Sequence, residues 1–151
     1  MEYIKATGLQ AEQIYALVQK TIQTVYPKYY RDEIVDFFCK HHSFDNIMKD
    51  IESGLVGVLE CDDRIVGTGC YRDNHITRVY VAPEFQGKGY GRYIMQCIEN
   101  EISKKHRIAY LDASLPASHF YENGGYKTVK HERYPVENDV ILVYEVMEKT
   151  L

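Results

Sequence analysis

Apolar residues recur at intervals of three and four along the first fifty residues, which is the spacing of amphipathic helices. One such run extends from Leu9 to Val25, and a second extends from Ile34 to His41. Thr7 begins a capping-box pattern, so we expect the first helix to start there and to end at Pro27. A third, shorter helical stretch is expected from Ser43 to Gly54.

Short β-branched or alternating runs predict seven strands, and two further helical runs lie among them. The helical runs are Tyr90–Lys104 and Ala117–Asn123. The resulting order, β-α-α-β-β-β-α-β-α-β-β, is typical of an α/β or α+β fold with a twisted mixed sheet. We expect a single domain over residues 1–151. The expected strands are Tyr3–Ala6, Leu55–Glu60, Arg64–Tyr71, Ile76–Val81, Ile108–Ala113, Lys127–Arg133 and Val140–Met147.

Composition and charge narrow the function classes. The chain is 45% hydrophobic and 26% charged, as ordinary globular proteins are. The net charge of −4 argues against nucleic acid as the main partner, because phosphate backbones are bound by clustered Lys and Arg. No apolar run approaches the roughly 18 residues of a membrane span, and the N-terminus lacks signal-peptide features. The four cysteines show no C-x-x-C pairing and the histidines no zinc spacing, so we expect a reduced, cytoplasmic protein without a metal.

Three alternating glycines mark the junction between the strand Ile76–Val81 and the helix that begins at Tyr90. They belong to the segment Gln86–Gly91, Q-G-K-G-Y-G, which we call the glycine loop. Glycine lets backbone N–H groups approach a ligand closely, and a helix N-terminus favours an anion. The loop therefore predicts a phosphate site, although a tight turn without a ligand fits the glycines alone equally well. It is neither a P-loop nor a Rossmann fingerprint, because both require other spacings.

Two motifs together resemble those of the GNAT acetyltransferase superfamily. The glycine loop fits the acyl-CoA-binding signature Q/R-x-x-G-x-G/A through Gln86, Gly89 and Gly91. The segment Phe120–Tyr126, F-Y-E-N-G-G-Y, resembles the second signature, F-Y-x-x-x-G-F/Y. The resemblance covers roughly Gly54 to Val146, and the predicted order of elements is also the GNAT layout. It implies an N-acetyltransferase that transfers an acetyl group from acetyl-CoA to a primary amine by direct attack in a ternary complex.

The resemblance also implies which residues bind the cofactor. Backbone N–H groups of the glycine loop would hold the pyrophosphate, with charge-assisted contacts from flanking basic side chains. In the family a bulge splays the preceding strand from its neighbour, which implies that the Val79 N–H faces the acetyl carbonyl and that Val81 faces the pantetheine arm. Ser114 stands where many members have a cofactor-binding asparagine, and we favour a helix N-cap role for it over a cofactor contact. The implied cofactor-binding set is Val79, Val81, Gln86, Gly87, Lys88, Gly89, Tyr90, Gly91, Arg92 and Ser114.

Two catalytic residues follow from the resemblance. Tyr121 matches the family tyrosine near the CoA sulfur, and a phenol that stays protonated at neutral pH can donate to the departing thiolate. His75 occupies the position where many lysine-acetylating members carry a glutamate, and a histidine can act as a general base near neutrality. The alternative roles are a core aromatic for Tyr121 and an exposed loop residue for His75. Deprotonation through water, without a dedicated base, is the alternative mechanism.

Acceptor pockets in this family are lined by the N-terminal helix pair and the last hairpin, which here supply aromatic side chains. We therefore expect Tyr26, Tyr29, Tyr30 and Tyr134 at the acceptor site, although ordinary packing suits each of them as well. A small-molecule amine is favoured over a protein acceptor. A non-catalytic acyl-CoA sensor and a dimer subunit with a vestigial site are the alternatives, and the apolar strand Val140–Tyr144 suits a homodimer.

Overall fold

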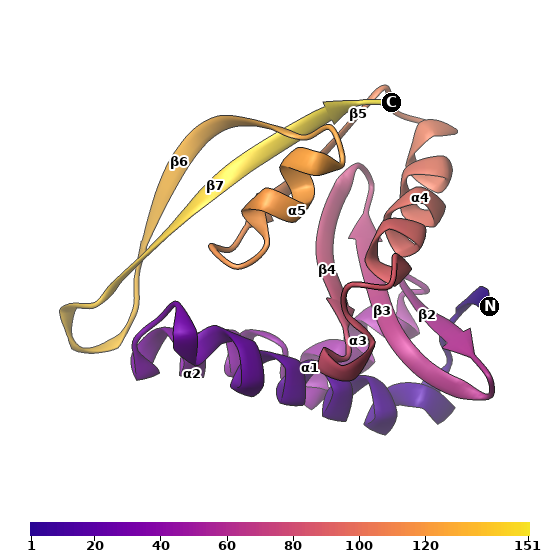
Figure 1. The fold of residues 1–151 in the computed structure, drawn as a ribbon, viewed down its shortest axis with the longest axis horizontal. Coiled ribbons are helices and arrows are strands. Elements are labelled where there is room, and N and C mark those ends of the chain that lie inside the picture. Colours follow the sequence, from indigo (N-terminus) through magenta and orange to yellow (C-terminus); the bar gives the residue numbers. More distant parts are fainter.

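A computed structural model describes residues 1–151, and a seven-stranded sheet forms its centre (Figure 1). The strands lie side by side in the order β1-β2-β3-β4-β5-β7-β6. Every neighbouring pair is antiparallel except β4 and β5, which are parallel, so the predicted mixed sheet is confirmed. The strands are β1 Glu2–Lys5, β2 Val56–Cys61, β3 Arg64–Arg72, β4 His75–Val81, β5 Ile108–Ala113, β6 Lys127–Pro135 and β7 Ile141–Thr150.

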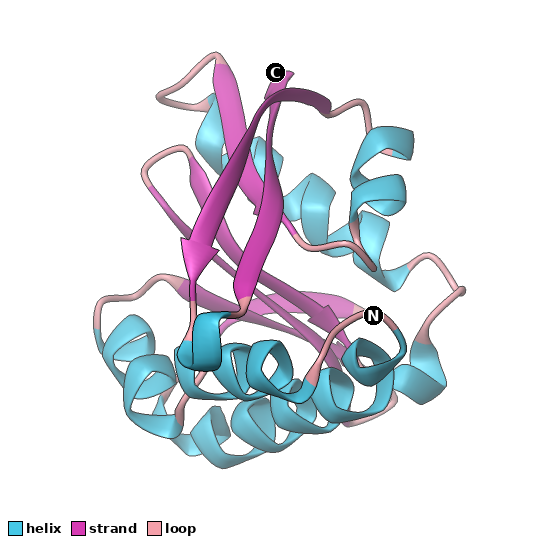
Figure 2. Ribbon diagram, turned by 90° about the vertical axis from the view of Figure 1, so that its left-hand side faces the viewer, coloured by secondary structure: helices cyan, strands magenta, loops and turns pink.

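Helices cover both faces of the sheet. Helices α1 to α3 gather along one face and α4 packs on the other, so that the strands lie between two groups of helices when viewed from the side (Figure 2). No helix combines the length and the apolar character that a membrane crossing requires. The helices are α1 Ala11–Val25, α2 Asp32–His41, α3 Phe44–Glu52, α4 Tyr90–Ser103 and α5 Ser118–Asn123.

The apolar stripe of each long helix is what attaches it to the sheet. Ile14, Val18 and Ile22 on α1 are completely buried, as are Ile94 and Ile98 on α4. These residues belong to two separate core clusters, one on each face. Full burial of one such aliphatic side chain contributes about 1.5–3 kcal/mol to stability. The helical spacing read from the sequence therefore decides which side of each helix meets the strands.

Two sequence predictions about local structure are wrong. Leu9 was expected on the buried stripe of the first helix, but its side chain is 92% exposed. The Thr7 capping box is present, with the Thr7 N–H donating to Gln10 Oε1 at 2.7 Å. It caps a single 3₁₀ turn, Gly8–Gln10, and α1 begins only at Ala11, so Leu9 lies outside the helical periodicity. The second error concerns Ser114, because α5 begins at Ser118 with no side chain capping it.

A bulge in β4 opens the sheet at its centre. Cys70 of β3 pairs with Arg78 and Tyr71 pairs with Ile76, which leaves Thr77 without a partner residue on β3. Beside the bulge, β4 pairs with β5 only through two residues, His75 and Ile76. Beyond that point the two parallel strands diverge, which leaves one edge of β4 unpaired within the sheet.

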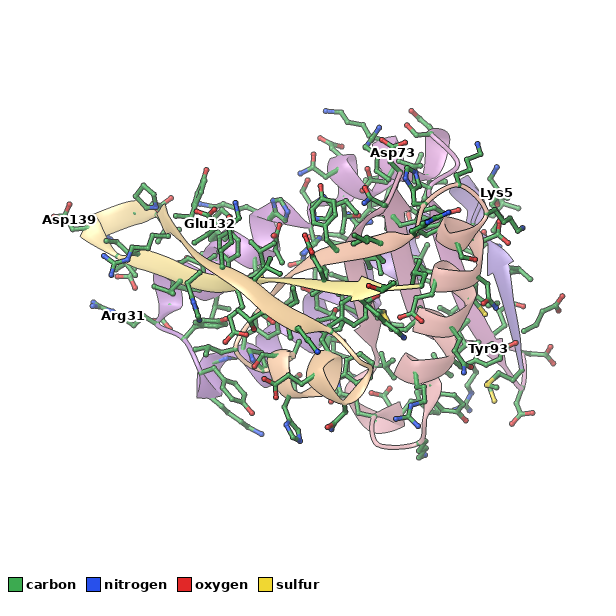
Figure 3. All side chains as sticks on the ribbon, turned by 90° about the horizontal axis from the view of Figure 1, so that it is seen from above. Lys5, Arg31, Asp73, Tyr93, Glu132 and Asp139 are labelled. Carbon is green, nitrogen blue, oxygen red and sulfur yellow. The ribbon has the colours of Figure 1, made fainter.

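The last two strands form a long hairpin that projects away from the rest of the sheet, with Asp139 at its tip (Figure 3). The hairpin lies over α2 (Figure 1), and a small core cluster formed by Ile34, Val140 and Leu142 joins the two. The ring of Tyr134 on β6 lies 5.2 Å from that of Phe37 on α2, measured between centroids. This contact adds to the cluster that joins the hairpin to α2.

Candidate active site

A cavity of about 900 Å³ lies where the two halves of the sheet separate. Its walls come from the β4 edge, the glycine loop, helices α4 and α5 and the end of α1. Nearly all of the sequence-predicted cofactor residues meet here, because Val79, Val81, Gln86, Gly87, Gly89, Tyr90, Gly91 and Arg92 all line the cavity. Lys88 and Ser114 do not line it, although Lys88 lies between two glycines that do.

The glycine loop requires glycine at two of its positions. Gly87 and Gly89 have φ angles of +76° and +89°, a region that other residues enter only at a cost in energy. Nothing lies within 4 Å of a Cβ placed at either residue, so the backbone conformation and not crowding selects glycine there. Gly89 is the N-cap of α4, whose first turn carries no acidic side chain. The positive end of the helix dipole therefore faces the cavity without internal neutralisation.

Gln86 and Gly91 connect the loop to its surroundings. The Gln86 Nε2 donates to the Val81 carbonyl oxygen at 3.0 Å and so ties the loop to the end of β4. A Cβ on Gly91 would lie 3.1 Å from Cζ of Phe120, which is closer than ordinary packing allows. Glycine at this position therefore lets α5 approach α4. The two motifs recognised in the sequence meet at this contact.

Backbone groups of β4 face the gap between β4 and β5. The Ala82 N–H donates to the Val66 carbonyl oxygen on the β3 side. Because hydrogen-bonded and non-hydrogen-bonded pairs alternate along antiparallel strands, Val79 and Val81 direct their N–H and C=O groups away from β3. Since β5 has diverged at this level, these groups face the cavity. The gap thus presents free polar backbone groups to the cavity.

Tyr121 lies in the wall opposite β4. Its side chain is buried, and its ring packs 5.2 Å from Phe120 and 5.9 Å from Tyr126, between centroids. Burial, with a smaller contribution from Tyr26, raises the pKa of the Tyr121 phenol above its ordinary value. The hydroxyl therefore stays protonated over the physiological pH range and is available as a donor.

Sequence reasoning missed a cluster of hydroxyl groups near Tyr121. The Tyr26 hydroxyl lies 3.2 Å from that of Tyr80 and 3.4 Å from Oγ of Ser114. Ser114 therefore contacts the Tyr26 hydroxyl instead of capping a helix. Tyr80 is buried, and burial raises its pKa well above the ordinary value. The sequence places Tyr80 on β4 next to Val79. The alternation of strand residues predicts that its side chain faces α1, but not that its hydroxyl meets that of Tyr26.

The predicted acceptor tyrosines separate into two groups. Tyr26 lines the cavity, and the Tyr30 hydroxyl accepts a 2.7 Å hydrogen bond from the Leu115 N–H, which fixes the loop before α5. Tyr29 and Tyr134 are about half exposed, at 51% and 49%, and do not line the cavity. Only Tyr26 therefore meets the cofactor-side residues directly.

His75 lies outside the cavity, at the closed end of the β4–β5 pair. Its imidazole stacks on the ring of Tyr110, with centroids 4.3 Å apart and planes 8° apart. Its Nε2 lies 3.4 Å from Oδ2 of Asp112, one residue beyond the last β4–β5 pair. Asp112 was not recognised in the sequence because it is distant from His75 along the chain.

An ion pair closes the cavity on the α4 side. The Lys149 Nζ lies 3.0 Å from Oε2 of Glu99, and the Tyr126 hydroxyl donates to the other carboxylate oxygen at 3.0 Å. All three residues line the cavity. They come from α4, the residue before β6 and the end of β7, and no pattern in the sequence joins them. No group of three or more His, Cys, Asp or Glu side chains is arranged to hold a metal ion.

Comparison with known proteins identifies the fold and the family. The family described as "Acetyltransferase (GNAT) domain" matches residues 25–150. A GCN5-related N-acetyltransferase from Rhodopseudomonas palustris has a similar structure, with a TM-score of 0.91, 19% identity, and coverage of 99% of this chain and 95% of the other. PaiA N-acetyltransferase from Thermoplasma acidophilum, solved with coenzyme A, gives a TM-score of 0.77 at 18% identity and covers 99% and 98%. YncA from Salmonella typhimurium, solved with acetyl-CoA, gives 0.76 at 18% identity and covers 100% and 94%.

A search among curated proteins finds no match to the sequence. The solved structures, all below 20% identity, establish the fold alone. The family match is the stronger finding, because it extends over most of the chain and includes both the glycine loop and the segment Phe120–Tyr126. The open β4 edge, the glycine loop and the buried tyrosine thus meet at one cavity of a chain that belongs to the GNAT acetyltransferase family.

Proposed function

We propose that this protein is an N-acetyltransferase that transfers the acetyl group of acetyl-CoA to a primary amine by direct attack in a ternary complex. The observation that carries the proposal is the single cavity that joins the glycine loop, the open edge of β4 and Tyr121. A phosphate site, a carbonyl-binding N–H and a proton donor are the groups that acyl transfer from a thioester requires.

Acetyl-CoA would lie along the cavity with its pyrophosphate at the glycine loop. The N–H groups from Gly87 to Gly91 and the N-terminus of α4 suit an anion, and Arg92 lines the cavity beside them. Lys88 has its Nζ 5.4 Å from the centre of the Phe85 ring, and it would reach the phosphates by swinging away from that ring. In support, PaiA and YncA were solved with coenzyme A and acetyl-CoA, respectively.

The thioester would lie in the gap between β4 and β5. When the amine attacks the carbonyl carbon, the carbonyl oxygen gains negative charge, and the Val79 N–H is oriented to stabilise it. The Val81 carbonyl oxygen already accepts a hydrogen bond from the Gln86 side chain. The Val81 N–H is therefore the group left to bind the pantetheine arm. Ser114 would take part only through Tyr26, because its hydroxyl faces that residue and not the cavity.

Collapse of the tetrahedral intermediate breaks the bond between carbon and sulfur and releases CoA as a thiolate. Tyr121 would donate its phenolic proton to that sulfur and recover a proton from water. Its raised pKa keeps the phenol protonated before the reaction, so that a proton is present when the thiolate forms.

The attacking amine must also lose a proton, and His75 remains our hypothesis for the base. The Asp112 carboxylate beside Nε2 would orient the imidazole and leave the other ring nitrogen to accept a proton. Val79 follows His75 by four positions along β4, a distance of about 13 Å along an extended strand. The proton would therefore travel through water, and deprotonation by water alone is the second candidate mechanism.

The acceptor would enter from the side of α2 and the β6–β7 hairpin. Tyr26 lies at the inner end of this path, and the half-exposed Tyr29 and Tyr134 would form its rim. Their aromatic faces suit a small cationic amine. A cytoplasmic location and a homodimer through the hairpin stay predictions; the exposed apolar side chains of Val129 and Val143 are compatible with the latter.

The proposal is tested by CoA release from acetyl-CoA with a panel of small primary amines. We expect turnover with at least one amine, and we expect Tyr121→Phe to lower kcat about 100-fold or more while the KM for acetyl-CoA changes little. Tyr93→Phe, at a partly buried tyrosine of α4 that does not line the cavity, is the matched control and should retain full activity. An unchanged kcat in Tyr121→Phe would remove the proton-donor role. Binding of acetyl-CoA without turnover of any amine would favour the sensor alternative.

A further inference from the structure

A second cavity, of about 320 Å³, lies on the other face of β4 from the glycine loop. Arg78 lines it, whereas the next residue, Val79, lines the first cavity, because neighbouring strand residues point to opposite faces. The remaining walls come from the end of α2, from α3 and from β3. The two cavities share no lining residue, but His42 of the second packs edge-on against Tyr80 of the first, with ring centroids 5.3 Å apart.

Arg78 is the unusual residue of this second cavity. Its side chain is almost completely buried, with a residue exposure of 5%. Its Nη2 donates to Oδ2 of Asp50 at 2.8 Å, and its Nε donates to Nδ1 of His42 at 3.1 Å. The third nitrogen, Nη1, has no hydrogen-bond partner, and it is the only buried side-chain nitrogen or oxygen in the protein of which this is true.

An unpartnered guanidinium nitrogen is costly, because burial removes its water and nothing in the protein replaces it. Both of the other nitrogens are held in fixed directions by α3 and by the end of α2, so the guanidinium cannot turn to satisfy Nη1 elsewhere. The guanidinium is therefore held in a fixed orientation in the wall of the cavity, with one buried donor left unpartnered. A planar guanidinium is the side chain best suited to bind carboxylate and phosphate oxygens.

The charges around the cavity have the sign that an anion requires. Lys49 and Arg72 also line it, and neither forms an ion pair within the protein. The one carboxylate in the lining, that of Asp50, is already paired with Arg78. His42 is uncharged, because burial first and Arg78 second lower its pKa well below the ordinary value. The lining thus carries three cations and one paired anion.

We propose that the Arg78 cavity is a binding site for a small oxyanion, a carboxylate or phosphate group, held by Nη1 of Arg78 with Lys49 and Arg72 at the rim. The site is argued from its own lining and does not depend on the acetyltransferase proposal. The oxyanion has two sources: a free anion, or a carboxylate carried by the amine acceptor, because His42 in its lining contacts Tyr80 in the lining of the reaction cavity.

Isothermal titration calorimetry with inorganic phosphate and with acetate, at low ionic strength, tests the site directly. We expect saturable binding to the wild-type protein. Lys49→Gln and Arg72→Gln should each weaken it about two- to fivefold, as the loss of one exposed charge does. Arg78→Lys should weaken it about tenfold or more, since the charge stays but the Nη1 donor is lost. The two rim variants keep the test decisive if Arg78→Lys does not fold.

Two controls separate this cavity from other cationic sites. Arg92→Gln reports on phosphate bound at the glycine loop, and Lys105→Gln reports on general surface charge; neither should change affinity for acetate at the Arg78 cavity. The absence of saturable binding to the wild-type protein would overturn the proposal, and water would then be the partner of Nη1. Equal affinity of wild type, Lys49→Gln and Arg72→Gln would overturn it as well.

The source of the oxyanion follows from a pair of matched amines in the CoA-release assay. If the acceptor carries the carboxylate, 4-aminobutyrate should be acetylated with a higher kcat/KM than butylamine, and Arg72→Gln should reduce that preference. Equal kcat/KM values would assign the site to a free anion. If neither amine nor any other is acetylated, the acetyltransferase proposal fails while calorimetry still decides the oxyanion site.

Discussion

Gly89 provides a prediction whose size follows from the geometry of the glycine loop. Its φ of +89° lies in the region that disfavours a Cβ, whereas nothing lies within 4 Å of the Cβ that Gly89→Ala would add. Only backbone strain is therefore introduced, which costs about 1–2 kcal/mol for a residue of this handedness. Alanine also restricts the unfolded chain, which returns about 0.4–1 kcal/mol. The net destabilisation should be about 0–1.6 kcal/mol.

Gly8→Ala is the matched control, because its backbone does not have a positive φ and its added Cβ would make only an ordinary 3.9 Å contact with Met48. This variant gains the unfolded-state effect without the strain. The free energies of unfolding of the two variants, measured by urea denaturation, should therefore differ by about 1–2 kcal/mol, with Gly89→Ala the less stable. Equal stabilities would refute the idea that strain selects glycine at Gly89.

The same variant should affect ligand binding, because Gly89 is the N-cap of α4 and its amide faces the proposed pyrophosphate site. If the loop relaxes to relieve the strain, its N–H groups lose their common direction. We expect Gly89→Ala to weaken acetyl-CoA binding about tenfold, equivalent to the loss of one charge-assisted hydrogen bond of about 1.4 kcal/mol. Binding as tight as that of the wild type would show that the loop does not contact the phosphates.

Two further predictions concern histidines. His75→Ala should abolish the loss of kcat toward acidic pH, and Asp112→Asn should reduce kcat by less than His75→Ala does; identical pH profiles would leave deprotonation to water. Because the pKa of His42 is lower in the folded protein than in the unfolded chain, the unfolded chain binds its proton first, and stability should fall as the pH drops below about 6.5. The melting temperature should therefore fall less between pH 7 and pH 5 in His42→Gln than in the wild type or in His119→Gln, and equal falls would contradict the reasoning.

Local patterns were sufficient to predict much of the fold. The helical stripes of α1 and α4 and the seven strands follow from side-chain periodicity, which is a property of neighbouring residues. The positive φ angles at Gly87 and Gly89 follow in the same way from glycine at a helix start. Leu9 shows the limit, since its spacing fits a helix but the chain there forms a 3₁₀ turn that ends one residue before α1.

The parts of the site that the sequence did not predict depend on contacts between distant segments. The hydroxyl cluster joins Tyr26, Tyr80 and Ser114, which come from three separate elements. Arg78 would ordinarily be assigned to solvent as a charged residue, yet its partner Asp50 and the bulge at Thr77 bring it inside. Such pairings depend on how strands and helices pack against one another, and the spacing of residues along the chain does not give that information.

The most direct test of the account is the melting temperature in the presence of acetyl-CoA, CoA, ATP or NAD, each added separately. A ligand at about 100 times its Kd stabilises the folded state by about 2.7 kcal/mol, which corresponds to a rise of about 5–11 °C for a protein of this size. We predict this rise with acetyl-CoA and CoA and a much smaller one with ATP and NAD. No rise with either CoA species would contradict the assignment of the glycine loop and, with it, the proposed acetyl transfer.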